Sequence, residues 1–475
     1  MSHNSHIDNL TNLYIQVYGH SPESVVLMPR SGSARIYYRI ISSQKSCIGT
    51  FNDDVRENET FIYLSNHLTN SNIPVPKILG VSVCKKYYLQ TDLGSLSLYD
   101  IITDTGSNSI VVESLIRQAV CNLAKFNALG YNGIDPAKLY PVSHFDAKSV
   151  MWDMYYFKYC FLKPSGIIFD EAELEKVFDY LQEIVLNGDN QLLQFRDFQS
   201  RNIMISGEEL YFIDFQGARI GSGLYDLASF LYQAKANLSD SLRQECLLLY
   251  LDEISKYRPI DRSALISLFP YMAIFRILQT LGAYGFRGLV ERKAHFIQSI
   301  PLALQNLAYL LESLDNNRLL YLSHLQLELS QMYKVEHFNG FDGLTVQIYS
   351  FSIKNGYPPL NPEHGGGFVF DCRYLPNPGQ IDEYKSLTGL DEPVSNYLNS
   401  LGEVKSFCDN AFTLVKSATD RYLSRNFKHL SVGFGCTGGQ HRSVFCAEQL
   451  VKYLKTNYGS SNIKVLVKHI ELEKR

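Results

Sequence analysis

The sequence has no long apolar run, no closely paired cysteines and no strong excess of charge of either sign. No apolar run approaches the ~20 residues that a helix needs to cross a bilayer. The nine cysteines are scattered singly, with no Cys-x-x-Cys pair, which argues against a disulfide framework and against structural zinc. A formal net charge of −4 is also far from the basic excess of a protein that binds nucleic-acid backbones. These absences argue against a membrane-spanning, disulfide-built or strongly basic protein.

The length and composition predict several globular domains. At 475 residues, with 45% hydrophobic and 19% charged residues, the chain is too long for one ordinary core, and we expect two or three domains. The opening residues MSHNSHIDNL lack the charged and apolar regions of a signal peptide. We therefore expect a soluble, cytoplasmic protein.

Three oxygen-bearing side chains lie close together in the segment FRDFQSRNIMISGEELYFIDFQGARIG. Asp197 is followed by Asn202, and Asp214 ends a further predicted strand, LYFIDF. Phosphoryl transfer needs a carboxylate that orients the attacking hydroxyl, together with oxygen ligands for the Mg²⁺ that bridges nucleotide phosphates. The segment supplies these groups in that order. Because Asp and Asn are also common in turns, Asp226 in the later string LYDLASFLY adds useful support.

The amino-terminal region predicts a place for a nucleotide. The string VVLMPRSGSARIYYRI is expected to form a strand, a tight turn and a second strand. The small residues Ser31, Gly32 and Ser33 in that turn would let the backbone approach triphosphate oxygens closely, although a plain hairpin also fits. The residues from Gln90 to Gly94 are the natural hinge over an adenine ring.

The strings RSGSARIYYR, FRDFQSRNIM, YFIDFQGARIG and YDLASFL resemble the aminoglycoside/choline phosphotransferase superfamily over about residues 8–310. Within it they are most similar to bacterial kinases that phosphorylate the anomeric hydroxyl of N-acetylmuramate or N-acetylglucosamine. The resemblance implies a two-lobed protein-kinase-like fold that binds ATP between its lobes. It also implies Asp197 as the catalytic base, Asn202 and Asp214 as Mg²⁺ ligands, and Asp226 as a structural brace of the catalytic loop.

The chain departs from this superfamily at the lysine that pairs with nucleotide phosphates. The strand SCIGTFN contains no lysine, and Arg35 or Arg39 on the neighbouring strand is the candidate substitute. Glu57 or Glu59, at the start of a predicted helix, would pair with such a cation. If neither arginine serves, the domain is a pseudokinase, and that alternative stays open.

A second candidate site lies near the carboxyl end, in LSVGFGCTGGQHRSVFCAEQLVKYL. A predicted strand runs to Cys436, and a glycine-rich turn then feeds a predicted helix whose first unpaired N–H groups favour an anion. Arg442 adds a forked cation suited to phosphate, and Ser443 adds another donor. Upstream, Asp371 and Arg373 are two residues apart in a predicted strand and therefore share a face.

Two interpretations of this turn compete. Cys436, Gly439, Arg442 and Ser443 fit the spacing of cysteine-dependent phosphatases, in which a thiolate attacks phosphorus while arginine holds the other oxygens. The histidine that usually precedes such a cysteine is absent, since Gly435 takes its place. In the alternative interpretation, the turn only binds a phosphate.

The strings SFSIKNGYP, FDCRYLPNPG, LTGLDEPV and GCTGGQHRSV resemble the C-terminal domain of the RNase adapter protein RapZ family, over about residues 340–460. The resemblance implies a domain that senses glucosamine-6-phosphate, and it favours binding over catalysis. The family's P-loop motif GxxxxGK[ST] is absent from this chain. The implied sugar-phosphate contacts are Asp371, Arg373, Cys436, Thr437, Gly438, Gly439, His441, Arg442 and Ser443.

The partners implied by the two resemblances are an amino sugar and a sugar phosphate. Some RapZ-family members bind RNA, and the family assembles through this domain, so RNA binding and a homo-oligomer stay open. A loose set of lysines is the candidate RNA patch: Lys452, Lys455, Lys464, Lys468 and Lys474.

We therefore predict an α/β protein with a two-lobed protein-kinase-like fold, followed by a smaller α/β domain with a strand, glycine-rich loop and helix that bind an anion. The expected kinase domain is 1–310, with a small lobe at 1–92 and a large lobe at 93–310. A linker helix at 311–333 and the second domain at 334–475 would follow.

The expected activity is transfer of phosphate from ATP, with Mg²⁺, to a hydroxyl of an amino sugar. The residues expected around the nucleotide are Ser31, Gly32, Ser33, Arg35, Arg39 and Gln90. The alternatives are a pseudokinase scaffold that binds sugar phosphate, or RNA, without turnover, and a cysteine-dependent phosphatase in the second domain.

Overall fold

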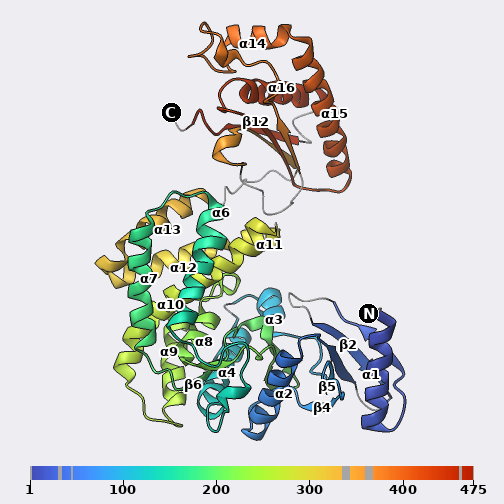
Figure 1. Ribbon diagram of the computed structural model, residues 1–475, viewed down its shortest axis with the longest axis vertical. Helices are drawn as coiled ribbons and strands as arrows, with labels where there is room; N and C mark the ends of the chain where they lie inside the picture. The colour runs from blue at the N-terminus through green and yellow to red at the C-terminus, as the bar shows by residue number, and fades with distance from the viewer. Residues whose placement is uncertain are drawn as a thin grey trace. The chain divides into compact units, whose positions relative to one another are not determined.

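The computed structural model describes residues 3–29, 35–43, 46–107, 109–291, 293–333, 343–358, 367–458 and 463–473. The chain forms two compact units, which Figure 1 draws as ribbons. The first comprises Met1–Cys160, Ile168–Ala283 and Pro301–Met332. The second comprises Phe161–Ile167, Tyr284–Ile300 and Tyr333–Arg475.

The amino-terminal part of the first unit is a five-stranded antiparallel sheet in the order β1-β2-β3-β5-β4. Its strands are β1 (Ser24–Leu27), β2 (Ile36–Ile41), β3 (Cys47–Phe51), β4 (Ile78–Val81) and β5 (Tyr87–Thr91). Helix α1 (His3–Tyr18) packs on this sheet, and its apolar residues Leu10, Leu13 and Tyr14 join a buried cluster with residues of β2, β3 and β5.

Helix α2 (Val55–Asn70) begins at a side-chain cap. The carboxylate of Asp54 accepts a hydrogen bond from the backbone N–H of Glu57 at 3.1 Å, which satisfies a donor that the helix leaves unpaired. Asn52 Nδ2 donates to the carboxylate of Glu57 at 2.7 Å. The cap and this bond fix both the backbone and the side chain of Glu57 in the first turn.

The rest of the first unit is mainly helical. Its long helices are α3 (Leu98–Thr105), α4 (Ile110–Leu129), α5 (Ala147–Phe157), α7 (Glu171–Leu186), α8 (Gly223–Leu231), α9 (Asp240–Ile254), α10 (Arg262–Tyr284), α12 (Ile300–Leu314) and α13 (Leu320–Met332). Two antiparallel pairs lie among them: β6 (Leu192–Gln194) with β9 (Arg219–Gly221), and β7 (Ile203–Ser206) with β8 (Glu209–Phe212). Asp197 and Asn202 lie in the connection from β6 to β7, and Asp214 lies in the connection from β8 to β9.

Short helical turns lie between the longer helices of the chain, in both units. They are η1 (Pro136–Lys138), η2 (Lys158–Leu162), α6 (Lys163–Ser165), η3 (Ser200–Asn202), η4 (Ala234–Ala236), η5 (Gly285–Val290), α11 (Ala294–Ile297) and η6 (Asn317–Leu319). Helix α13, in the segment predicted as a linker helix, packs on α7. The domain limits given above stay a prediction.

Helix α10 and the turn after it, Arg262–Val290, are long and apolar enough to cross a membrane, and no other helix in the described residues meets that test. Arg276 and Gln279 interrupt its apolar sequence. The most apolar part of the segment is 56% buried inside the fold, where Met272, Phe275 and Leu278 belong to the core. Burial of this kind is typical of a core helix.

The second unit contains a four-stranded parallel sheet in the order β11-β12-β10-β13. Its strands are β10 (Leu344–Ser352), β11 (Gly367–Asp371), β12 (His429–Cys436) and β13 (Ile463–His469), with turns η7 (Ile353–Asn355) and η8 (Pro378–Gln380). Helices α14 (Glu392–Ser400), α15 (Gly402–Ser424) and α16 (Arg442–Asn457) accompany the sheet (Figure 1). Alternate residues of β10 and β12, such as Val346 and Val432, form the core with α15 and α16.

The parallel register places several chain ends at one edge of this sheet. Ser352 at the end of β10 is opposite Cys436 at the end of β12, and Asp371 at the end of β11 is opposite Gly435. Carboxyl ends of parallel strands are a common position for ligand sites. The predicted anion-binding turn begins at this edge.

Candidate functional site

The predicted catalytic segment is the connection between β6 and β7. Arg196 (φ 86°) and Asp214 (φ 68°) both have left-handed backbone conformations, which residues other than glycine rarely adopt. Strain of this kind persists only where the surrounding structure holds it, and it is common at functional sites.

Asp226 of α8 helps to hold this backbone conformation in place. Its fully buried carboxylate accepts hydrogen bonds from the backbone N–H of Phe195 at 2.6 Å, from that of Arg196 at 2.8 Å, and from Asn127 Nδ2 at 2.9 Å. Burial raises the pKa of Asp226 to about 7, although these three donors oppose the rise. The side chain therefore anchors the two residues that precede Asp197.

Asp197 and Asn202 belong to one hydrogen-bonded loop. The Asp197 side chain is 53% exposed and open to a ligand, whereas Asn202 is buried. Asn202 Nδ2 donates to the main-chain oxygen of Asp197 at 2.8 Å. Because a carbonyl oxygen can only accept, this bond leaves the amide oxygen of Asn202 as an acceptor.

Asp214 lies two residues beyond the end of β8, and its neighbour Phe215 packs on helix α2. Gln216 Nε2 donates to Asp214 Oδ1 at 2.8 Å. The next residue, Phe215, stacks on Phe61 of α2 with 4.9 Å between ring centroids. The helix that carries Glu57 is thus packed against the segment that carries Asp214.

Asn202 and Asp214 fit Mg²⁺ in their donor chemistry. Together they offer an amide oxygen and a carboxylate oxygen, and Mg²⁺ is commonly held by one or two side chains together with phosphate oxygens and water. In the described residues, no group of three or more His, Cys, Asp or Glu side chains could hold a metal alone. A cation here would therefore rely on the phosphates of a ligand.

Arg35 lies between Glu57 and Asp214. Its guanidinium is 3.0 Å from Glu57 Oε1 and 3.9 Å from Asp214 Oδ1, and only 2% of the side chain is exposed. Burial alone would lower the pKa of Arg35, but Tyr88, Tyr37 and Glu57 outweigh it and raise the pKa. Arg35 is therefore a permanent buried cation.

The other residues expected around the nucleotide differ in position. Arg39 pairs with Asp92 at 2.8 Å and donates to the main-chain oxygen of Gly94 at 2.9 Å, so it braces the predicted hinge. Gln90 is buried in β5, and its Nε2 lies 3.5 Å from Thr50 Oγ1. Ser31, Gly32 and Ser33 lie outside the described residues.

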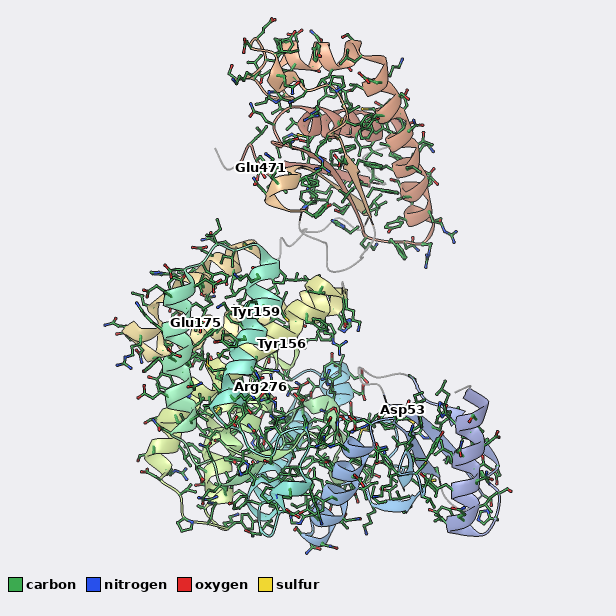
Figure 2. The ribbon with its side chains drawn as sticks, in the orientation of Figure 1. Asp53, Tyr156, Tyr159, Glu175, Arg276 and Glu471 are labelled. Carbon is green, nitrogen blue, oxygen red and sulfur yellow. The ribbon has the colours of Figure 1, made fainter. Side chains whose placement is uncertain are left out.

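Sequence reasoning missed a group of buried arginines beside Asp197. Arg276 of α10 approaches Asp197 Oδ1 to 3.5 Å and is 4% exposed; Figure 2 labels it. Arg196 pairs with Asp153 at 2.6 Å. Arg219 of β9 is 9% exposed, and burial together with Arg196 lowers the pKa of Arg219 to about 10. The sequence signal that could have revealed Arg276 is an arginine within the otherwise apolar string YMAIFRIL.

The glycine-rich turn of the second unit forms one wall of a pocket. The pocket has a volume of about 270 Å³. It is lined by Asn377, Gly379, Lys385, Cys436, Thr437, Gly438, Gln440, His441 and Arg442. Of these, Asn377, Gly379, Lys385 and Gln440 were not expected from the sequence.

Hydrogen bonds hold the turn against its neighbours. Ser352 Oγ donates to the main-chain oxygen of Thr437 at 2.7 Å, and His441 Nε2 lies 3.0 Å from the main-chain oxygen of Tyr384. Gly439 has φ 67°, and a Cβ there would approach the backbone nitrogen of Ser352 to 2.8 Å. This position therefore requires glycine twice over, for conformation and for space.

Of the other residues predicted to bind the sugar phosphate, Arg442 lines the pocket, whereas Asp371 and Arg373 do not. Arg442 is buried, and its Nη1 donates to the main-chain oxygens of Arg373 at 2.7 Å and Leu375 at 2.8 Å. The side chains of Arg373 and Asp371 pair with each other at 2.6 Å and are about half exposed. They do not belong to the pocket lining.

Two other predictions concern Cys436, the possible nucleophile, and the lysines of the candidate RNA patch. The Sγ of Cys436 lies 3.2 Å from the hydroxyl of Ser443, and both residues are buried. In the candidate RNA patch, Lys468 pairs with Glu473 at 3.6 Å, and Lys474 lies outside the described residues.

Two family models match separate parts of the chain. The phosphotransferase enzyme family model matches residues 29–260, and the RapZ C-terminal domain model matches residues 344–473. The chain joins a phosphotransferase-family domain to a RapZ C-terminal domain. The predicted fold class is confirmed, with a protein-kinase-like phosphotransferase domain and a second α/β domain built on a parallel sheet.

Two curated relatives match less than a third of this chain. Nucleotide-binding proteins are 37% identical over 140 residues in Thermotoga sp. (strain RQ2) and 38% identical over 151 residues in Bacillus cytotoxicus. These matches cover 29% and 32% of this chain. The chain spans about half the length of these relatives, 47% in each case.

Solved structures match about two thirds of this chain. The choline kinase LicA from Streptococcus pneumoniae is 14% identical with a TM-score of 0.45, over 65% of this chain and all of that one. The aminoglycoside phosphotransferase APH(4)-Ia, solved with ADP and hygromycin B, is 13% identical with a TM-score of 0.43, over 64% of this chain and 98% of that one.

Proposed function

We propose that the phosphotransferase domain transfers phosphate from ATP to a hydroxyl of an amino sugar, with the anomeric hydroxyl of N-acetylmuramate or N-acetylglucosamine as the expected acceptor. One observation carries the proposal. An exposed carboxylate, Asp197, shares its loop with Asn202, while Asp214 lies 3.9 Å from a buried cation that is itself paired with a helix carboxylate.

In this proposal Asp197 accepts a hydrogen bond from the acceptor hydroxyl and orients it toward the γ-phosphate. Its open side chain supports that role, and Asp226 fixes the backbone on which it stands. Asn202 and Asp214 would hold Mg²⁺, which supplies charge neutralisation at the phosphates. Orientation and charge neutralisation are the main contributions that proteins make to phosphoryl transfer.

Arg35 takes the place of the missing strand lysine in this proposal. The ion pair with Glu57 keeps the guanidinium on the side of the sheet that faces Asp214, where nucleotide phosphates would lie. Arg39 is engaged by Asp92 and Gly94, which favours Arg35 of the two candidates. A buried and permanently charged group supports an active kinase over a pseudokinase.

A screen of acceptors tests the proposal. The purified full-length protein is given ATP and Mg²⁺, and ADP formation is measured over N-acetylmuramate, N-acetylglucosamine, glucosamine and an aminoglycoside. We expect acceptor-dependent ADP with at least one acetylated amino sugar. Binding of ATP without acceptor-dependent ADP from any of these would favour the pseudokinase scaffold.

We also propose that the RapZ C-terminal domain binds a sugar phosphate such as glucosamine-6-phosphate without converting it. The supporting observation is the pocket at the N-terminus of α16, where Arg442, His441 and Lys385 meet a glycine-rich turn. The volume of about 270 Å³ is near the lower end for a small-ligand site.

Calorimetry separates binding from the phosphatase alternative. The full-length protein is titrated with glucosamine-6-phosphate while free phosphate is assayed. Saturable heat without released phosphate supports binding alone. Phosphate release that disappears in Cys436→Ser would establish the phosphatase instead, because that reaction needs the thiolate.

A further inference from the structure

The arginines beside Asp197 carry more positive charge than their neighbours balance. Arg276 is near Asp197 and Arg196 is paired with Asp153, but no carboxylate lies within 4 Å of Arg219 in the described part of the chain. Arg219 Nε instead donates to the main-chain oxygen of Gly217 at 3.3 Å. Three guanidinium groups thus face two carboxylates.

These side chains form one cluster around a single ring. The guanidinium of Arg196 lies 4.9 Å, and that of Arg276 lies 5.4 Å, from the ring centre of Tyr225 in α8. Arg219 on β9 is opposite Gln194 on β6, two residues before Arg196. Four elements, β6, β9, α8 and α10, therefore contribute polar side chains to this cluster.

Several buried polar atoms of this cluster have no hydrogen-bond partner among the described residues. They are Arg196 Nη1, Arg276 Nε, Asp153 Oδ2, Tyr225 Oη, Gln194 Oε1 and Gln194 Nε2. Buried groups are normally satisfied, and a concentration of exceptions points to a bound molecule or water. Two of these atoms, Asp153 Oδ2 and Gln194 Oε1, are acceptors, so the negative charge of the ligand is inferred from the excess of guanidinium groups, and Arg196 Nη1 and Arg276 Nε are the guanidinium donors without partners.

We infer that the acceptor of the phosphotransferase domain carries an anionic group, a carboxylate or a phosphate, which Arg219 and Arg276 hold near the hydroxyl that Asp197 orients. The inference rests on the proposed kinase function and narrows its substrate class. Guanidinium groups suit either anion. In Arg276, Nη1 donates to Gln279 and Thr280 and Nη2 faces Asp197, so Nε is the donor that lacks a partner. A cationic acceptor such as an aminoglycoside would meet like charges instead, which disfavours its binding.

The first test compares matched acceptors with the wild-type, full-length protein. N-acetylmuramate and N-acetylglucosamine 6-phosphate each add one anion to N-acetylglucosamine, and the two distinguish a carboxylate from a phosphate. With ATP and Mg²⁺, we expect kcat/KM for one of them to exceed that of N-acetylglucosamine by about tenfold or more. Equal or faster turnover of the neutral sugar, or of an aminoglycoside, overturns the inference.

The second test removes the unbalanced cation. Arg219→Gln is expected to raise KM for the anionic acceptor about tenfold or more, and so to lower the ratio of kcat/KM for the anionic acceptor to that for N-acetylglucosamine about tenfold or more. Arg117→Gln is the matched control, because Arg117 is a surface residue paired with Glu113 and Glu245. An unchanged preference in folded Arg219→Gln overturns the inference.

The two proposals fail in different ways. If no acceptor yields ADP although ATP binds, the kinase proposal fails and this inference fails with it. If neutral acceptors react best, the kinase proposal stands and only the anionic acceptor is excluded. The wild-type comparison decides between these outcomes even where a variant does not fold.

Discussion

Arg35 illustrates how one side chain can serve two partners. A buried cation is costly unless it is paired, and Glu57 at 3.0 Å supplies the pair inside the first unit. Asp214 at 3.9 Å is more distant and 42% exposed, so it stays available to other ligands. The arrangement fixes the guanidinium firmly while leaving the candidate metal ligand free to bind.

Loss of Arg35 should weaken nucleotide binding. We expect Arg35→Gln to raise KM for ATP about tenfold to a hundredfold, the range for a lost hydrogen bond to a charged group. Lys86→Gln, which removes an exposed pair with Asp53, is the matched control and should leave KM unchanged. Steady-state kinetics decide the matter, and a larger effect from Arg39→Gln would contradict the assignment.

Loss of the Asp197 carboxylate should act on turnover. Asp197→Asn is expected to lower kcat by ~10²–10⁴-fold, as for a lost general base, while the affinity for ATP stays within a few-fold. Rapid-mixing assays of ADP formation and a fluorescence titration with nucleotide measure the two quantities. Equal activity in the variant would remove Asp197 from the mechanism.

Sequence patterns predicted those single residues that lie near one another in the chain. Asp197, Asn202, Asp214 and Asp226 were named from the motif strings, and hydrogen bonds join the segments that carry them, while their catalytic roles stay a prediction. Arg276 was not predicted, because it reaches Asp197 from α10 and nothing near Asp197 in sequence announces it. The sequence also could not decide whether Arg35 or Arg39 replaces the missing lysine, because the structure alone shows that Arg35 pairs with Glu57 and Arg39 with Asp92.

At the scale of elements, helix α8 acts on the catalytic loop through Asp226. Its carboxylate is the acceptor for two successive backbone N–H groups, which keeps Arg196 in a left-handed conformation. The cost is a buried acid whose pKa is about 7 rather than 3.8. Two strand limits predicted from alternation were wrong, because β11 ends at Asp371, before Arg373, and β8 ends at Phe212, before Asp214. The long-range contact of Asp226 was also not predictable from the sequence.

The raised pKa of Asp226 predicts a pH dependence of stability. The folded state binds the proton more tightly than the unfolded state, so this contribution is complete below pH 4 and is lost as pH rises to about 7, by about 4 kcal/mol. The free energy of unfolding of wild type, minus that of Asp226→Asn, should therefore fall between pH 4 and pH 7. Urea unfolding at several pH values measures this difference, and a flat difference would contradict the buried acid.

The turn between β12 and α16 depends on Gly439 in the same way. A side chain there is strained at φ 67° and meets the backbone of Ser352. We expect Gly439→Ala to weaken binding of glucosamine-6-phosphate about tenfold or more, because the turn must shift to accommodate it. Gly402→Ala is the control, since a Cβ at that position meets open space. Isothermal titration would contradict the prediction if both variants bound alike.

At the scale of the whole molecule, the chain combines a phosphotransferase-family domain with a RapZ C-terminal domain. We propose that the second domain reports amino-sugar status to the first. Coupling of this kind requires a ligand whose affinity differs between two states of the protein, and it must act in both directions. Joining the domains in one chain does not provide that difference by itself.

The proposed coupling has a direct measurement. Saturating glucosamine-6-phosphate is expected to change KM for ATP or for the acceptor by about fivefold or more, the usual size of allosteric coupling. Arg442→Gln, which alters the pocket of the second domain, should remove the change. Identical kinase kinetics with and without the sugar phosphate would show that the two domains act separately.

The left-handed backbone at Arg196 bears on how such a kinase can change over evolutionary time. Glycine adopts this conformation without penalty, so Arg196→Gly would relax the main chain while deleting one guanidinium. The loss would fall on Asp153, which would be left without its partner. Under the proposed function, this one substitution would lower the positive charge beside Asp197 and relax the backbone that leads to it, at the cost of an unpaired Asp153.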